Sequence, residues 1–230
     1  MGKKGVRNFN WLNLRFVYLL TFGILLVCSK PESTLERNIK NLKSEDSVAR
    51  KKAAKALGEL RDPKAVDPLI DALKDVDYDV RKTAIIALGK IGDHKAIKPL
   101  VDRLGDEDGI ANAALNALIN IGSSSVEPLL SLLQTGTSRQ KVIAAKGLGA
   151  IGGRRATEGL IAGLKDSDPN VRKAVILALA KINTAQAIEA IANMMNDENS
   201  DVANTAAQAL RGSGNEGLRQ VRRLLRARGF

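Results

Sequence analysis

Few residues of this 230-residue chain belong to types that carry out catalysis or hold a metal ion. The one histidine, His94, lies in a turn expected between two helices and has no nucleophile placed beside it. The one cysteine, Cys28, excludes an intramolecular disulfide and any site built from several cysteines. The glycines between positions 147 and 153 follow no predicted strand, so they do not indicate a nucleotide-binding loop. We therefore predict a protein without enzyme activity, cofactor or bound metal.

The chain is organised by an internal repeat, which is clearest in the segment 77–105, DYDVRKTAIIALGKIGDHKAIKPLVDRLG. A leucine recurs every 30 or 31 residues, each time directly after a small residue. These leucines are Leu57, Leu88, Leu118, Leu148, Leu179 and Leu210. A repeat of this length is typical of a solenoid, in which each unit buries its apolar face against its neighbours. The predicted fold class is all-α.

Each repeat reads as a helical hairpin. In the segment 77–105, Val80 to Ile91 have apolar residues at helical spacing, and so do Ile97 to Leu104. Pro99 sits in the first turn of the second helix, where an N–H group would lack an intrahelical acceptor in any case. Six such hairpins are expected, at residues 46–74, 77–105, 108–134, 138–165, 168–196 and 199–226.

The motifs Asp79-Val80-Arg81 and Ala87-Leu88-Gly89, with the run from Ala96 to Leu100, resemble the short bacterial HEAT repeats of the phycobilin-lyase type. The resemblance implies an α-solenoid whose second helices line a concave side that holds partners. Some HEAT-like proteins are di-iron hydroxylases that bind metal through His-Glu dipeptides, and this chain contains none. The repeat serves as a scaffold in unrelated proteins, so it says little about function.

Residues 1–28 have the features of an export signal. Basic residues precede an apolar run of twelve, Phe16–Val27, which is too short to cross a hydrocarbon core of about 30 Å. Leu25 to Cys28 resembles a lipobox, although Val27 stands where Gly, Ala or Ser is usual. We predict lipidation of Cys28 and a membrane-anchored protein of the bacterial cell envelope. An ordinary export signal, an uncleaved anchor and a cytoplasmic protein are the alternatives.

The rest of the chain divides into a tether with a capping helix, residues 29–45, and the solenoid, residues 46–230. Ser33 followed by Glu36 predicts a capping box at the start of the capping helix. A column of basic residues lies near the start of the first helices, at Arg50, Arg81, Lys141 and Arg172. We expect these to form ion pairs with the acids Asp75, Asp106, Asp166 and Asp197 that recur between hairpins. Ligand binding by the same column is the alternative.

The net charge of +11 is concentrated at the two ends of the chain. Residues 1–28 carry +4 and residues 211–230 carry +5, which leaves +2 for the body. The C-terminal helix presents the arginines Arg219, Arg222, Arg223 and Arg226. It is expected to close the stack, and a contact with an anionic membrane is the alternative.

Charged side chains at exposed positions of the second helices predict a partner-binding groove that is mostly acidic. Its residues are Asp67, Asp71, Lys98, Asp102, Glu127, Glu158 and Glu189. The sequence therefore predicts a membrane-tethered scaffold that binds a protein or peptide along this groove. Binding of nucleic acid or another polyanion is a less favoured alternative, because the body is nearly neutral.

Overall fold

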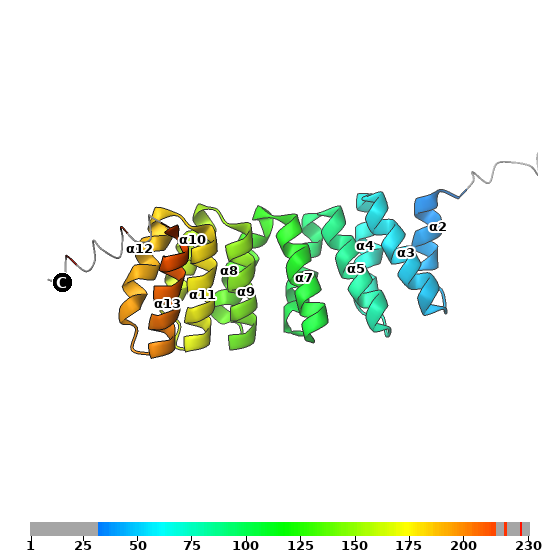
Figure 1. Cartoon of the computed structure of the whole chain (residues 1–230). Helices are drawn as coiled ribbons and strands as arrows, with labels where there is room; N and C mark the ends of the chain where they lie inside the picture. The colour runs from blue at the N-terminus through cyan, green and yellow to red at the C-terminus, as the bar shows by residue number, and fades with distance from the viewer. Residues whose placement is uncertain (1–31, 215–218, 220–225, 227–230) are drawn as a thin grey trace, which may run out of the picture.

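The computed structural model describes residues 32–214, 219 and 226. These residues form a row of helical hairpins that stand side by side from α2 at one end to α12 and α13 at the other (Figure 1). The described residues contain helices, turns and loops but no β-strand. The prediction of an all-α solenoid is confirmed.

The first five hairpins begin and end close to the predicted positions, and the sixth begins close to its own; beyond Gly214 the structure describes only residues 219 and 226. The N-terminal capping helix is α2 (Thr34–Asn41). The first helices of the hairpins are α3 (Ser47–Leu60), α5 (Tyr78–Ile91), α7 (Asp108–Ile121), α9 (Ser138–Ile151), α11 (Pro169–Ile182) and α13 (Ser200–Gly212). The second helices are shorter: α4 (Val66–Ala72), α6 (Ile97–Asp102), α8 (Val126–Thr135), α10 (Arg154–Gly163) and α12 (Ala185–Asn193). A 3-10 turn precedes α4, α6 and α8, a detail that the repeat pattern did not predict.

Local capping explains where the helices start and stop. At the start of α2, the Ser33 hydroxyl accepts from the Glu36 N–H, and the Glu36 carboxylate accepts from the Ser33 N–H, which confirms the capping box. Asp77 caps α5 by accepting a hydrogen bond from the Val80 N–H. At the other end of α5, Gly92 adopts a left-handed conformation with φ of 78°, which stops the helix without steric cost.

The repeated leucines form the spine of the core. All six have 0 or 1% of their surface exposed. Directly after three of these leucines stand glycines, and each faces the small residue of the next repeat. A Cβ on Gly149, for example, would lie 2.7 Å from the Cα of Ala178. The missing side chains therefore allow neighbouring first helices to pack at the distance that the leucines need.

The junction between the third and fourth hairpins differs from the others, and we name it the third junction. Ile119 stands directly after a repeated leucine, where the neighbouring repeats have glycine. Gly147 stands directly before a repeated leucine, where the other repeats have alanine. Helix α9 packs mainly on α8 and less on α7, whereas α9 and α11 pack extensively on each other. The space left by Gly147 is filled by the tips of Leu115 and Leu129, to which a Cβ would come within 2.8 and 3.1 Å.

Candidate interaction surfaces

Three of the four basic residues in the column form the predicted ion pairs. Arg172 donates from Nε and Nη2 to both carboxylate oxygens of Asp197, each over 2.8 Å, and from Nη1 to the Asp166 and Ser167 carbonyls. Arg50 binds Asp75 in the same way and also contacts two carbonyls of the loop before α3. Each arginine thus holds together the loops at the two ends of its own hairpin. These hydrogen bonds lower the pKa of Asp75 and Asp197.

The other members of the column vary. Lys141 pairs with Asp166 over 2.7 Å. Arg81 pairs with Glu107 over 3.4 Å, whereas Asp106 pairs with Arg103, so the predicted partner of Arg81 is replaced by the next acid along the chain. In the third hairpin both positions have lost their charge: Ala111 takes the place of the arginine and Gly136 that of the acid. The third junction therefore has no such pair.

The structure places the predicted groove residues together on the second helices. Glu158 is half-buried, and the other six are exposed: Asp67, Asp71, Lys98, Asp102, Glu127 and Glu189. They lie on the second helices of five successive hairpins, which are α4, α6, α8, α10 and α12. No feature of the described residues establishes that they bind a partner, so their role stays a prediction.

Three of these acids already have partners within the chain, of which Asp67 is the most loosely paired, with Lys95 at 3.9 Å. Glu127 accepts from Arg155 over 2.6 and 3.1 Å, and Glu158 accepts from Arg154 over 2.8 Å. The hydrogen bonds from Arg155 lower the pKa of Glu127. The prediction of a mostly acidic groove took account of the acids but not of these arginines, which stand at the start of α10. The middle of the row is therefore nearly neutral, and its negative charge lies towards the two ends.

A hollow of about 430 Å³ marks the N-terminal end of this row. It lies between α2 and α4, and Asp67, Pro68 and Asp71 line one side of it while Ile39 and Lys43 line the other. Two groove residues thus border a real depression, which combines apolar and charged groups.

The first helices form a second charged surface, which sequence reasoning missed. The six first helices contain fourteen basic and four acidic residues, whereas the five second helices contain three basic and six acidic ones. The net charge of the body conceals this separation because acids in the loops between the helices offset most of the positive charge of the first helices. Assigning residues to first and second helices before counting would have revealed it.

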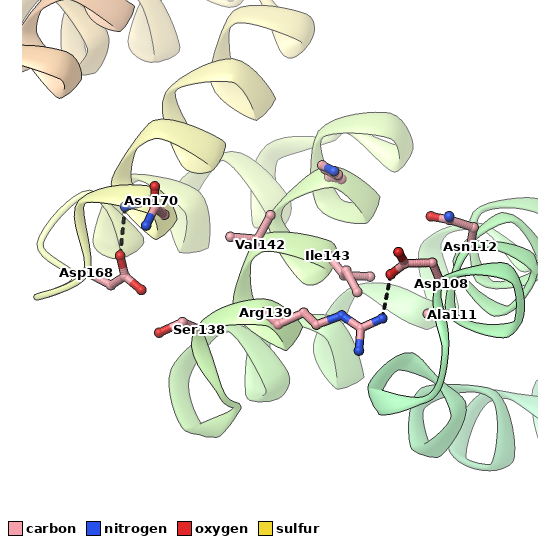
Figure 2. A pocket seen from close by; sticks show the side chains of 10 residues that line it. Asp108, Ala111, Asn112, Ser138, Arg139, Val142, Ile143, Asp168 and Asn170 are labelled. Atoms are coloured by element: carbon pink, nitrogen blue, oxygen red, sulfur yellow. Dashed lines mark hydrogen bonds and ion pairs between the residues drawn. The ribbon is translucent and has the colours of Figure 1, made fainter.

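Two connected hollows lie on the side of the first helices. One, of about 450 Å³, spans the third junction between α7 and α9. Figure 2 shows Arg139 reaching across it to Asp108, with 2.6 Å between Nη2 and Oδ1. The other, of about 590 Å³, continues over α11 to α13. The two hollows share Val142, Lys146 and Asn170.

Several predicted residues fall outside this description. Cys28, Arg222 and Arg223 lie outside the described residues, whereas Arg219 and Arg226 are helical and exposed. No described helix is long and apolar enough to span a membrane. Within residues 32–214, 219 and 226, no three His, Cys, Asp or Glu side chains gather as metal ligands. His94 is exposed, and its Nδ1 lies 3.4 Å from Asp93.

Solved structures with the same architecture include importin β, which matches with a TM-score of 0.55 at 18% identity over 79% of this chain and 30% of its own. An engineered protein matches at 26% identity with a TM-score of 0.43, covering 80% of this chain and 98% of its own. The CpcE–CpcF complex of phycocyanin lyase from Nostoc sp. matches at 25% identity with a TM-score of 0.41, covering 85% and 95%. No curated protein sequence matches the chain.

The family model for HEAT repeats matches residues 35–119 and 126–211. These two segments make up most of the chain and contain the capping helix and all the hairpins described above. The repeated leucines, the glycine and alanine contacts between first helices and the arginine pairs recur within these segments at intervals set by the repeat of 30 or 31 residues. The chain belongs to the HEAT-repeat family.

Proposed function

We propose that the protein is a non-catalytic, membrane-tethered scaffold that binds another protein or a peptide along its second helices. A HEAT-repeat solenoid is compatible with such a role, since its long stack offers a continuous surface to a partner. The observation that supports the proposal best is the row of charged, mostly exposed side chains on α4 to α12, with the hollow between α2 and α4 at one end.

The free carboxylates of the row define the chemistry of the partner. Asp71, Asp102 and Glu189 are exposed and have no basic group within 4.0 Å in the described part of the chain. Glu127 and Glu158 are neutralised by arginines, so they offer little net charge to a ligand. A partner would therefore place basic residues at the two ends of the row and polar or apolar residues at its middle.

Reversing the charge of the three free carboxylates tests this proposal. Replacing Asp71, Asp102 and Glu189 with lysine is expected to abolish most of the capture of a cellular partner by residues 29–230. The physical reason is that each attractive pair with a basic partner becomes a repulsive one. The measurement is a pull-down quantified by mass spectrometry, followed by titration with the purified partner.

A control variant with the same change in net charge separates the row from general electrostatics. Glu32, Glu45 and Glu59 are exposed and lie outside the second helices. Changing these three to lysine should leave capture intact. Equal capture by wild type and the row variant would remove the second helices from the proposal.

The membrane tether rests on the sequence of residues 1–28, and its chemistry would be a lipid on the Cys28 thiol. A single chain gives weak, reversible attachment, and a second signal makes it stable. The wild-type protein is expected to fractionate with membranes and to begin at Cys28, with a mass increased by lipid. Cys28→Ala should yield an unprocessed precursor or a soluble product. Identical fractionation of both forms with an intact N-terminus would exclude lipidation.

A further inference from the structure

The larger hollow on the first helices is a second built surface, which we name the α9–α13 groove. It has a volume of about 590 Å³, and its main lining residues are Val142, Lys146, Lys173, Ala174, Leu177 and Lys181. It lies on helices other than those of the acidic row, so a ligand here would not compete directly with a partner on the second helices.

The three lysines of the groove have no internal counter-charge. Lys146 and Lys181 are exposed and Lys173 is half-buried, and none has a carboxylate within 4.0 Å among the described residues. Two other basic residues of the first helices are engaged within the chain, because Lys51 pairs with Asp79 over 2.6 Å and Arg139 pairs with Asp108. The positive charge of the α9–α13 groove is therefore available to an external anion.

The nearest acids line the adjoining hollow and not the α9–α13 groove itself. Asp168 borders the hollow at the third junction, where it caps α11 by accepting a hydrogen bond from the Asn170 N–H. Hydrogen bonding from Ser138, together with that N–H, lowers the pKa of Asp168. Asp108 is held by Arg139 on the far side of the same hollow. Both carboxylates are engaged within the chain.

Between the lysines, the groove is apolar. Leu177 is 59% exposed, the second-highest exposure among the large apolar residues of the described chain. It projects from α11 beside Ala174, and Val142 of α9 borders the same hollow. An aliphatic side chain of a ligand could bury surface against Leu177, and burial of apolar surface is the main favourable contribution to association.

We propose that the α9–α13 groove binds an acidic peptide segment of a partner protein, with an aliphatic side chain placed on Leu177 and carboxylates on the three lysines. An acidic partner is inferred because its carboxylates would complement the three lysines. A protein is inferred because its aliphatic side chains can pack on the exposed leucine. A nucleic acid would favour aromatic side chains for base stacking, and the lining contains none. A bilayer surface is broad and would not enter a hollow of this size.

The probe is a short fluorescent peptide of glutamates with two leucines, titrated with the full chain and followed by anisotropy. Changing Lys146, Lys173 and Lys181 to glutamine is expected to weaken binding about tenfold, because three charge pairs are lost at once. Leu177→Ser is expected to weaken it by about threefold at unchanged salt dependence, since only apolar contact is removed. A peptide with alanine in place of leucine should bind wild type and Leu177→Ser equally.

A matched control changes Lys52, Lys55 and Lys90 to glutamine. These first-helix lysines are exposed, lie outside the groove and have no carboxylate within 4.0 Å in the described chain. The control should bind the probe as wild type does. The variant with Asp71, Asp102 and Glu189 changed to lysine should do so too. Equal weakening by the control and the groove triple variant would overturn the proposal. So would oligothymidylate binding as tightly as the peptide, which would assign the surface to polyanions in general.

Discussion

Replacing Asp197 with alanine is expected to lower the free energy of unfolding by about 3 kcal/mol. Asp197 and Arg172 form the most buried ion pair of the described residues, with 6 and 7% of their side-chain surface exposed. The substitution removes the buried carboxylate from the Arg172 guanidinium. What remains are two carbonyls, which carry only partial charges, and the exposed carboxylate of Glu198 at 3.9 Å. Urea unfolding, followed by the loss of helical circular dichroism, measures the effect.

The double variant Arg172→Leu with Asp197→Leu distinguishes a lost charge partner from lost packing. Removing both charges leaves no buried ion, so this variant should be clearly more stable than Asp197→Ala. The exposed pair of Lys51 and Asp79 provides a matched control, with 48 and 55% exposure. Asp79→Ala should leave the unfolding midpoint nearly unchanged. Equal losses from Asp197→Ala and Asp79→Ala would contradict the role assigned to the buried pair.

Replacing Gly149 with alanine is expected to destabilise the protein by roughly 1–2 kcal/mol, although alanine favours helix by about 1 kcal/mol over glycine. The new Cβ would lie 2.7 Å from both the Cα and Cβ of Ala178 and 3.0 Å from its carbonyl oxygen. Those atoms cannot yield without moving α11 away from α9. Gly149→Leu should cost about 3 kcal/mol or more for the same reason.

Replacing a glycine with alanine at the end of α13 should instead stabilise the protein. A Cβ on Gly212 would meet nothing within 4 Å, so Gly212→Ala gains helix preference at no steric cost. Thermal and urea unfolding of Gly149→Ala and Gly212→Ala, measured under one condition, gives both signs. Stabilisation by Gly149→Ala would show that the two helices separate easily and that close packing does not set their spacing.

The fold could be predicted because the same packing requirements recur in each of the six repeats. The leucine column must be buried, and its spacing therefore located the first helix of every hairpin. The ion pairs were also predictable, since an arginine and an acid recur at fixed positions. The shift of Arg81 from Asp106 to Glu107 was not, because it depends on Arg103 competing for the same carboxylate.

The candidate surfaces were predicted less completely. Exposure of the second-helix acids followed from helical spacing, and the pair of Arg154 with Glu158 lies four residues apart within α10, but the pairing of Glu127 with Arg155 depends on how α8 and α10 lie next to each other. The α9–α13 groove combines residues from three repeats, of which none departs from the repeat in an obvious way. Such a groove emerges only from the stacking of helices.

The third junction sets a limit on cooperativity along the array. In a stack of repeats each unit is stabilised by its neighbours, so the coupling across each junction decides how far unfolding spreads. Because Ala111 and Gly136 carry no charge, this junction lacks the ion pair between a basic residue and an acid that ties the loops together in other hairpins. Parting α7 and α8 from α9 and α10 therefore breaks apolar contacts and two exposed pairs, Arg139 with Asp108 and Arg155 with Glu127, but no buried ion pair among the described residues. The capping helix and the first three hairpins thus form one block, and the hairpins that follow form another. The two blocks can unfold locally to different extents.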